Sequence, residues 1–453
     1  MTRQVQRVRM PLWVDPAAVY ATLAQGEPRA IWLDAGPHAT SGLSYISIPT
    51  DRLLTEDVES GDITIFEKLR SSLEHDSTVD ASAAREDGFA LGWVGWLGYE
   101  LAAHTAGVPT ATSRTPDALF VYVDWALEFD HELQHMDLLV LGSPEELTHK
   151  QEELTAVLSS AHAPSITEPE TVSATEVKWR HAPDHYTSLV TQCLDAIRAG
   201  DAYQLCLTNE VQVAGSFAPL EVYLRLREAN PSHHGGLIKL EQLALLSSSP
   251  EVFLRIDADG HLTTKPIKGT RKRGADVSGD EALAAELLAS EKERAENLMI
   301  VDLMRNDVGK VAQLGTVRVD SLLEVETYEH VHQLVSTVSA QLAQGMSAVD
   351  ALEACFPAGS MTGAPKISAM TILHGLEQGP RGIYSGAFGY LGIDGSANLA
   401  MVIRSIVLTS EGASIGTGGG ITSGSLPQAE LEETWVKVAP LLRALGVASS
   451  EYS

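Results

Sequence analysis

Short apolar runs separated by turn residues fill the first third of the chain. AIWLDAG, FALGWVGWLGYEL, ALFVYVDWALEF and HMDLLVLG alternate in polarity or are rich in β-branched and aromatic residues, which predicts strands. QEELTAVLSS has instead the apolar spacing of a helix. Residues 161–184 are rich in Pro, Ser, Thr and Glu without an apolar period, which is typical of a linker or a long surface crossing.

The remaining residues, about 185–446, mix clear helices with strands and Gly-rich turns. The pattern therefore predicts an N-terminal domain over 1–160, a linker over 161–184 and a larger C-terminal domain over 185–446. Strands and helices do not alternate strictly along the chain. This favours an α+β fold with large mixed or antiparallel sheets over a doubly wound one.

Composition limits the classes of partner. The chain has 453 residues, of which 44% are hydrophobic and 20% charged, and this balance is ordinary for a globular protein. Its 32 Lys and Arg against 60 Asp and Glu give a formal charge of −28. Nucleic acids and anionic membranes attract basic surfaces, so neither is expected as the main partner. An anionic substrate needs a local cluster of Arg, Lys, metal or helix N-termini.

The cysteines and the N-terminus indicate the compartment. Cys193, Cys206 and Cys355 are odd in number and far apart, without zinc spacing, so we expect reduced, buried thiols. The sequence has no apolar core of a signal peptide and no apolar run long enough to span a membrane. We therefore expect a cytoplasmic protein.

Two predicted helices carry paired carboxylates. Glu293 and Glu296 are three residues apart, and Glu430, Glu433 and Lys437 follow the same helical spacing. Solvated acidic turns, or glutamates that interact with a helix dipole, give the same pattern. If the two helices converge, their carboxylates could hold a hard cation such as Mg²⁺, which prefers oxygen ligands.

A Gly-rich stretch, IGTGGGITSGS at 415–425, precedes the second of these helices. Consecutive glycines let backbone N–H groups approach an anion, although a tight strand-to-helix turn is equally compatible with the spacing. No Gly-Lys-Ser/Thr follows, so this is not a nucleotide-binding P-loop. Ser425 and Pro427 predict the cap and first turn of the helix.

Two basic residues lie in apolar surroundings. Lys268, in KPIKGTRKRG, sits at a strand end among small residues, where desolvation can free its amine as a nucleophile. A basic surface turn explains the same segment. Arg404, in MVIRSIVL, is a charge within an apolar strand that needs a partner, and a substrate carboxylate is one option.

Two further segments add polar groups. Ser360 and Thr362, in FPAGSMTGAPK, predict a helix start with free hydroxyl and N–H groups. His332 and Tyr384 lie in largely apolar runs. A single histidine in such a run is more typical of a satisfied core residue than of a catalyst.

A series of motifs follows in a fixed order: SPEVF, PIKGTRKRG, KERAENLMIVDLMRND, HVHQLVS, FPAGSMTGAPK, IYSGAFGYLG, VIRS, GTGGG and PQAELEETWVK. This order resembles the chorismate-utilising enzymes, which include component I of anthranilate synthase and of aminodeoxychorismate synthase, and the isochorismate and salicylate synthases. The resemblance covers about residues 185–445 and extends more loosely into the first 160 residues. It implies an α+β, two-sheet sandwich flanked by helices, with a smaller N-terminal lobe and an active-site cleft in the larger domain.

The resemblance also assigns roles to individual residues. It implies that Glu296 and Glu433 hold Mg²⁺, supported by Glu293 and Glu430, and that Glu251 is the general acid that protonates the departing 4-hydroxyl of chorismate. The implied chorismate contacts are Gly269, Thr270, Tyr384, Arg404, Gly418, Gly419, Gly420 and Lys437, with His332 and Ser360 near the ring.

Two positions choose among the members of the family. Members that use water as the nucleophile resemble one another in having a lysine base at the position of Gln204. Ammonia is already nucleophilic, so a member that uses ammonia needs no such base. Anthranilate synthases resemble one another in having PIAGT where this chain has PIKGT. Lys268 therefore matches the members that add ammonia at C4. The resemblance thus implies Mg²⁺-dependent formation of 4-amino-4-deoxychorismate through a Lys268 adduct. The ammonia would come from a separate glutamine amidotransferase subunit, and the product would serve p-aminobenzoate and folate synthesis.

Three alternatives make different predictions. Anthranilate synthase component I would release pyruvate and leave Lys268 a bystander. A nucleotide-binding regulator would use the GTGGG segment and bind phosphate without Mg²⁺-dependent turnover. A scaffold that only docks the glutaminase would not need the acid, the lysine or the metal glutamates.

Overall fold

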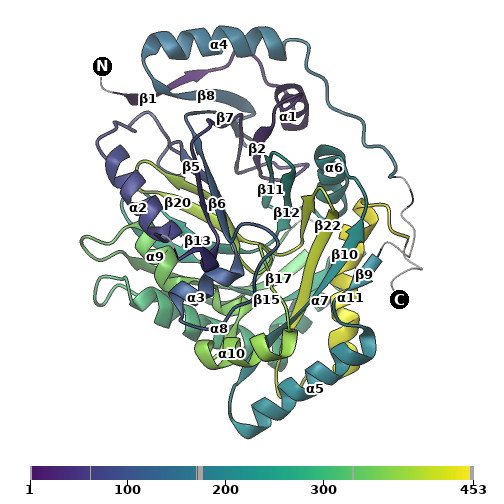
Figure 1. Cartoon of the computed structure of the whole chain (residues 1–453). Helices are drawn as coiled ribbons and strands as arrows, with labels where there is room; N and C mark the ends of the chain where they lie inside the picture. Colours follow the sequence, from purple (N-terminus) through teal and green to yellow (C-terminus); the bar gives the residue numbers. More distant parts are fainter. Residues whose placement is uncertain (1–2, 62, 170, 172–176, 329–330, 449–453) are drawn as a thin grey trace.

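The computed structural model describes residues 3–61, 63–169, 171, 177–328 and 331–448, and their strands form two antiparallel sheets (Figure 1). The first sheet has the order β1 (Gln4–Arg9), β8 (His135–Gly142), β7 (Trp125–Asp130), β3 (Leu43–Ser47), β2 (Arg29–Asp34), β11 (His234–Leu240), β12 (Leu243–Ser249), β21 (Ser405–Thr409), β22 (Gly412–Ile421), β10 (Gln204–Ala214) and β18 (Gly363–Ala364), with β9 (Val177–Trp179) also paired to β10.

The second sheet has the order β15 (Ile267–Lys272), β17 (Val331–Gln341), β14 (His261–Thr264), β13 (Val252–Ile256), β20 (Ala397–Met401), β19 (Ala387–Gly392), β5 (Gly92–Leu97), β6 (Ala118–Val123) and β4 (Leu53–Glu56), with β16 (Arg318–Thr327) also paired to β17. The α+β class is therefore confirmed.

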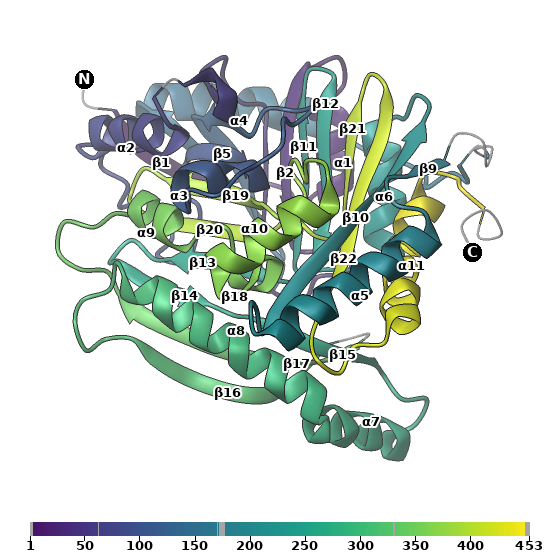
Figure 2. The same ribbon diagram turned by 60° about the horizontal axis from the view of Figure 1, so that its bottom comes forward.

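Helices cover the outer faces and the ends of the sheets. Within the described residues they are α1 (Pro16–Leu23), α2 (Ile65–Asp76), α3 (Ala102–Thr105), α4 (Pro144–Leu158), α5 (Pro183–Ala199), α6 (Pro219–Ala229), α7 (Val277–Ala289), α8 (Glu291–Gly309), α9 (Ala348–Cys355), α10 (Lys366–Glu377) and α11 (Pro427–Ala444), with the short 3-10 turns η1 (Val58–Ser60), η2 (Tyr99–Leu101) and η4 (Gly359–Met361). In Figure 2, α8 runs along β16 and β17, with α7 beyond its end.

The central strands are buried on both faces, which explains their nearly continuous apolar sequences. In β2, Ile31 and Leu33 point into the core that includes Trp93 and Phe120 of the second sheet. Ala30 and Trp32 point the other way, into the core beneath α1, α4, α6 and α11. Successive side chains alternate faces as a strand requires, but both faces meet apolar neighbours.

Strands from the first 160 residues pair directly with later ones in both sheets. β2 pairs with β11 in the first sheet, and β5 pairs with β19 in the second. The domain boundaries at 160 and 185 therefore stay a prediction. Within the predicted linker, residues 161–169 and 171 have no helix or strand, β9 begins at Val177, and α5 begins at Pro183.

The structure also tests two further expectations, that the cysteines are reduced and buried and that no segment spans a membrane. The three cysteines are buried and form no disulfide, as expected. In the part of the chain that the structure describes, no helix has both the length and the apolar character that a membrane crossing needs.

Candidate active site

Lys268 and Glu251 lie close together, although β15 and β13 are not adjacent strands of the second sheet. Lys268 is on β15, where the pairing with β17 shifts register between Ile267 and Thr270. Glu251 immediately precedes β13 and is buried. Burial raises the pKa of the Glu251 carboxyl, whereas the Lys268 charge, the Ser360 hydroxyl and the backbone N–H of Ile267 all favour its ionised form. A buried carboxyl with a raised pKa can carry a proton beside a lysine.

The bulge in β15 brings a glutamate from α8 to the same place. Gly269 has a φ of 85°, which only glycine adopts readily, and a Cβ there would lie 3.0 Å from the carboxyl carbon of Glu293. The α8 helix begins at Glu291 with Ser290 as its cap, and packs against β15 and β17. The predicted helical face carrying Glu293 and Glu296 is therefore confirmed as local structure.

The α11 helix supplies the second pair of glutamates. It begins at Pro427 with Leu426 at the cap position, so the prediction that Ser425 is the cap was wrong. The Ser425 hydroxyl instead donates to Oε1 of Glu430 at 2.6 Å. A Cβ on Gly419 would lie 3.0 Å from Glu430 Oε2 and 4.0 Å from Glu433 Oε1. The missing side chain of this glycine therefore leaves room for the Glu430 carboxylate, and Glu433 lies at an ordinary contact distance.

A lysine lies between the carboxylates of the two helices. The Lys292 ammonium group is 3.4 Å from Glu430 Oε1 and 3.9 Å from Glu296 Oε1. Burial raises the pKa of Glu296 to about 7, with Glu293 and Glu430 adding repulsion. Burial opposes ionisation of Glu433 as well, but Lys437 and Lys292 hold its pKa below its usual value.

The four glutamates have the donor chemistry of a Mg²⁺ site, although the described residues include no group of three His, Cys, Asp or Glu placed to hold one ion. Glu296 Oε1 is buried and makes no hydrogen bond within the described structure. Such an orphaned carboxylate oxygen is costly unless a cation or a proton reaches it. Its chemistry fits a hard cation, and Lys292 now supplies the positive charge nearby.

The Gly-rich segment is a strand rather than a tight strand-to-helix turn. Gly416 to Gly420 lie inside β22, paired with β10 over its whole length. A Cβ on Gly416 would overlap the ring of Tyr384, and one on Gly418 would overlap the carbonyl of Leu207. These glycines are needed for close packing across the strand, so the interpretation of this segment as a turn was wrong.

Cationic side chains lie beside this strand. Lys437 donates to the carbonyl of Gly418 at 2.7 Å and pairs with Glu433 at 2.7 Å. Arg404 was predicted inside a strand, but it occupies a turn with φ of 53° between β20 and β21. Burial lowers the pKa of its guanidinium, which faces Tyr384 and Glu433. Among the ion pairs of the described residues none involves Arg404, so its charge is available to an anion.

Gln204 lies at the start of β10, against Gly420. Its side chain is fully buried, and neither amide atom has a hydrogen-bond partner within the described structure. An unpartnered buried amide is unfavourable unless a ligand satisfies it. Gln204 therefore presents a donor and an acceptor beside the glycine strand.

Other predicted residues have different surroundings. Both ring nitrogens of His332 are engaged, with Thr327 at 2.9 Å and Asp280 at 2.8 Å. Thr270 is exposed. Ser360 lies in η4, and α10 begins only at Lys366, so the prediction of a helix start at Ser360 and Thr362 was wrong. The chorismate contacts of His332 and Thr270 stay a prediction.

The family follows from comparison with known proteins. A model of the family described as chorismate binding enzyme matches residues 8–443. The chain belongs to the chorismate-binding enzymes. It is 40% identical to an aminodeoxychorismate synthase of Streptomyces griseus over 97% of this chain and 64% of the relative, so it spans about two thirds of that protein's length.

Two anthranilate synthases are similar over most of their length. The chain is 38% identical to anthranilate synthase component 1 of Thermus thermophilus, over 96% of each. A crystal structure of anthranilate synthase component I from Streptococcus pneumoniae TIGR4 has a TM-score of 0.77 and 28% identity, covering 96% of this chain and 99% of the other. The predicted two-sheet fold of this chorismate-binding enzyme is thus confirmed.

Sequence reasoning missed three residues near the site. Lys292 lies in the first turn of α8, an ordinary acidic helix, and no pattern marks it as the bridge between two helices. Glu377 and Arg381 form a buried ion pair at the end of α10. Their i, i+4 spacing was visible, but their contacts with distant segments were not.

Proposed function

We propose that this chain aminates chorismate at C4 to form 4-amino-4-deoxychorismate. The observation that carries the proposal is the placement of Lys268 next to the buried carboxyl of Glu251. This pair combines an amine nucleophile with a carboxyl group whose raised pKa lets it hold a proton. The similarity to the aminodeoxychorismate synthase of Streptomyces griseus supports the same activity.

Chorismate is a dianion, and the site offers cations in an otherwise acidic chain. We assign one substrate carboxylate to Arg404, since this half-buried guanidinium has no ion pair among the described residues. We assign the second substrate carboxylate to Lys437 and the Gly418–Gly420 backbone. The Tyr384 ring, which packs flat on Gly416, forms a wall for the substrate.

The proposed reaction makes and breaks bonds at two ring carbons, C2 and C4, and replaces the C4 hydroxyl with an amino group. The neutral amine of Lys268 adds to C2, the ring double bonds shift, and the C4 hydroxyl leaves as water with a proton from Glu251. Ammonia then adds at C4, the double bonds shift back, and the C–N bond to Lys268 breaks, which returns the amine. The enolpyruvyl ether is kept throughout, so this step releases no pyruvate.

Mg²⁺ is the cofactor we propose, held by Glu296 and Glu433 with Glu293 and Glu430 in support. When bound, the ion would supply positive charge that neutralises a substrate carboxylate. The orphaned oxygen of Glu296 supports this assignment. Lys292 would have to give up its place between Glu296 and Glu430.

The nitrogen source completes the proposal. All three cysteines are buried, whereas a glutaminase nucleophile must be reachable and readily ionised. We therefore propose that a separate glutamine amidotransferase subunit delivers ammonia, that the reaction is cytoplasmic, and that the product feeds p-aminobenzoate and folate synthesis. Gln204, rather than a basic residue, lies at the strand end beside Gly420. Its amide can bind ammonia but cannot activate water as a base.

Anthranilate synthesis is the second candidate, because the Thermus thermophilus relative is named anthranilate synthase component 1. The test is to incubate the purified chain with chorismate, Mg²⁺ and an ammonium salt, and to measure chorismate consumption together with pyruvate. The proposal predicts ammonium-dependent consumption without pyruvate. Equimolar pyruvate with a fluorescent product would favour anthranilate synthesis, and absence of consumption would contradict both.

A further inference from the structure

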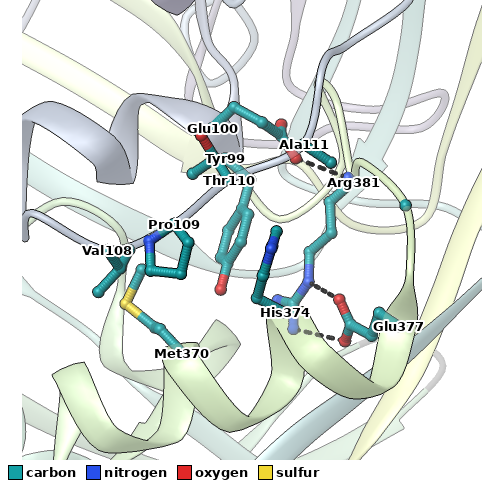
Figure 3. A pocket seen from close by; sticks show the side chains of 11 residues that line it. Tyr99, Glu100, Val108, Pro109, Thr110, Ala111, Met370, His374, Glu377 and Arg381 are labelled. Atoms are coloured by element: carbon teal, nitrogen blue, oxygen red, sulfur yellow. Dashed lines mark hydrogen bonds and ion pairs between the residues drawn. The ribbon is translucent and has the colours of Figure 1, made fainter.

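Arg381 is the most completely bonded cation near the site. Its side chain is 1% exposed, and it lies over the ring of Tyr99 at 4.1 Å. Nε and Nη2 form a two-pronged pair with Glu377 at 2.8 and 2.7 Å. Figure 3 shows this pair beside Tyr99, at a cavity of only about 10 Å³. That space is about the size of one water molecule, too small for a substrate to reach the guanidinium.

The remaining donors of Arg381 reach backbones that carry site residues. Nη1 donates to the carbonyl of Met361 at 2.6 Å and contacts the Ser385 hydroxyl at 3.4 Å. Nη2 donates to the carbonyl of Cys206 at 2.8 Å. Met361 follows Ser360, and Ser385 follows Tyr384. Cys206 is paired with Gly420 across the first sheet.

Glu377 extends the same connections. Its Oε1 accepts the backbone N–H of Thr208 at 2.9 Å, and Thr208 is paired with Gly418. One ion pair thus joins η4, the turn before β19, and the strand that holds the glycines of β22. No other side chain type offers five donors in one rigid plane, so lysine cannot reproduce these contacts.

The N-terminal part of the chain holds the backbone of Arg381 in place. Glu100, in η2, accepts the N–H of Arg381 at 2.8 Å and the N–H of Gly382 at 2.9 Å. The backbone N–H of Tyr99 donates to the carbonyl of Gly382 at 2.9 Å. Figure 3 shows Glu100 at the backbone of Arg381 and Glu377 at its guanidinium, so both ends of this residue are held.

We propose that Arg381, held by Glu377 and Glu100, is a positioning residue that sets Ser360, Tyr384 and the Gly418–Gly420 strand for chorismate. The proposal rests on the chorismate-aminating function above for its kinetic consequence only. Its structural part, that one guanidinium orders three separate site segments, can be tested without turnover.

A second buried pair in the chain provides a matched control. Arg227 makes a two-pronged pair with Asp34 at 2.8 and 3.2 Å, and lies over the ring of Trp32 at 4.7 Å. Arg227 lies on α6, which packs against β11, β12 and α11, and its guanidinium bonds to Asp34 of β2 rather than to β15 or Lys268. Arg227→Lys therefore removes the same planar fork from a similar environment, and reports what such a change costs the fold alone.

The experiment compares Arg381→Lys with Arg227→Lys. Hydrogen exchange is measured on peptides covering 204–208, 359–362 and 384–386, and kcat and KM for chorismate are measured with ammonium. We expect faster exchange in all three peptides for Arg381→Lys only, with kcat/KM lowered by about tenfold or more, and kcat/KM of Arg227→Lys within about twofold of the parent. Urea unfolding midpoints show how far each change affects the whole fold.

Two results would overturn the proposal. One is unchanged exchange in the three peptides of Arg381→Lys, and the other is an equal loss of kcat/KM in both variants. If Arg381→Lys does not fold, Glu377→Gln is judged by the same criteria, since it keeps the size of the side chain and one acceptor. A parent chain that does not consume chorismate would contradict the proposed function, while the exchange data would still decide the role of Arg381.

Discussion

Replacing Glu100 with glutamine should change how the stability of the fold depends on pH. Burial raises the pKa of this carboxyl to about 7, and the like charge of Asp117 adds to the effect. Opposing them are the backbone N–H of Arg381 and the Arg381 charge, both of which favour the carboxylate. Burial prevails, so the folded protein retains a proton on Glu100 at pH values where the unfolded chain has lost it.

The sign and size follow from proton linkage. Between the ordinary glutamate pKa of 4.5 and the folded value of about 7, the folded state binds more protons than the unfolded state, so stability falls as pH rises. A shift of about 2.5 pKa units corresponds to about 3 kcal/mol in the free energy of unfolding. Most of that loss develops between about pH 5 and about pH 7. Glutamine does not titrate, and it loses one of the two oxygens that accept the N–H groups of Arg381 and Gly382. The stability of Glu100→Gln relative to the parent should therefore start lower and rise with pH over this range.

The assay is urea unfolding followed by tryptophan fluorescence, at several pH values from about 5 to about 8. The quantity of interest is the difference between variant and parent, because other buried groups titrate equally in both. Glu145→Gln, at an exposed position on α4, is the control substitution. A difference for Glu100→Gln that does not change with pH, or that favours the parent as pH rises, would refute the account of this buried carboxyl.

Three other substitutions test separate parts of the site. Lys268→Ala should abolish most aminodeoxychorismate formation while chorismate affinity by calorimetry stays within about threefold, and Lys265→Ala should be close to the parent; near-parental turnover of Lys268→Ala would remove the nucleophile from the scheme. Lys292→Met should tighten Mg²⁺ binding measured by calorimetry by up to about fivefold, since a half-exposed competing charge is worth about 1 kcal/mol or less; weaker binding would show that Lys292 is no competitor. Gly416→Ala should cost about 1–3 kcal/mol in urea unfolding because its Cβ overlaps the Tyr384 ring, and an unchanged midpoint would contradict that packing.

Local patterns allowed the regular elements to be predicted. Strands such as β2 and β6 lie within the predicted apolar runs, although the run ALFVYVDWALEF is divided in the structure between β6 and β7. The helices α8 and α11 carried their glutamates at helical spacing. In each case the signal lies within about ten neighbouring residues, which is the range over which periodicity is informative.

The errors arose where distant segments decide the local structure. The glycines of β22 look like a flexible turn in sequence, but they are set by the approach of Tyr384 and of the β10 backbone. Arg404 lies in a turn because β20 and β21 belong to different sheets. The bond from Arg381 to Cys206 spans 175 residues, and no local pattern encodes it.

The position of the new C–N bond tests the central claim most directly. The purified chain is incubated with chorismate, Mg²⁺ and isotope-labelled ammonium, and NMR of the isolated product identifies the ring carbon bonded to the label. Attack through a Lys268 adduct predicts the label at C4, with the enolpyruvyl ether intact. Label at C2 with release of pyruvate would contradict it, and would mean that the lysine beside Glu251 does not direct where ammonia enters.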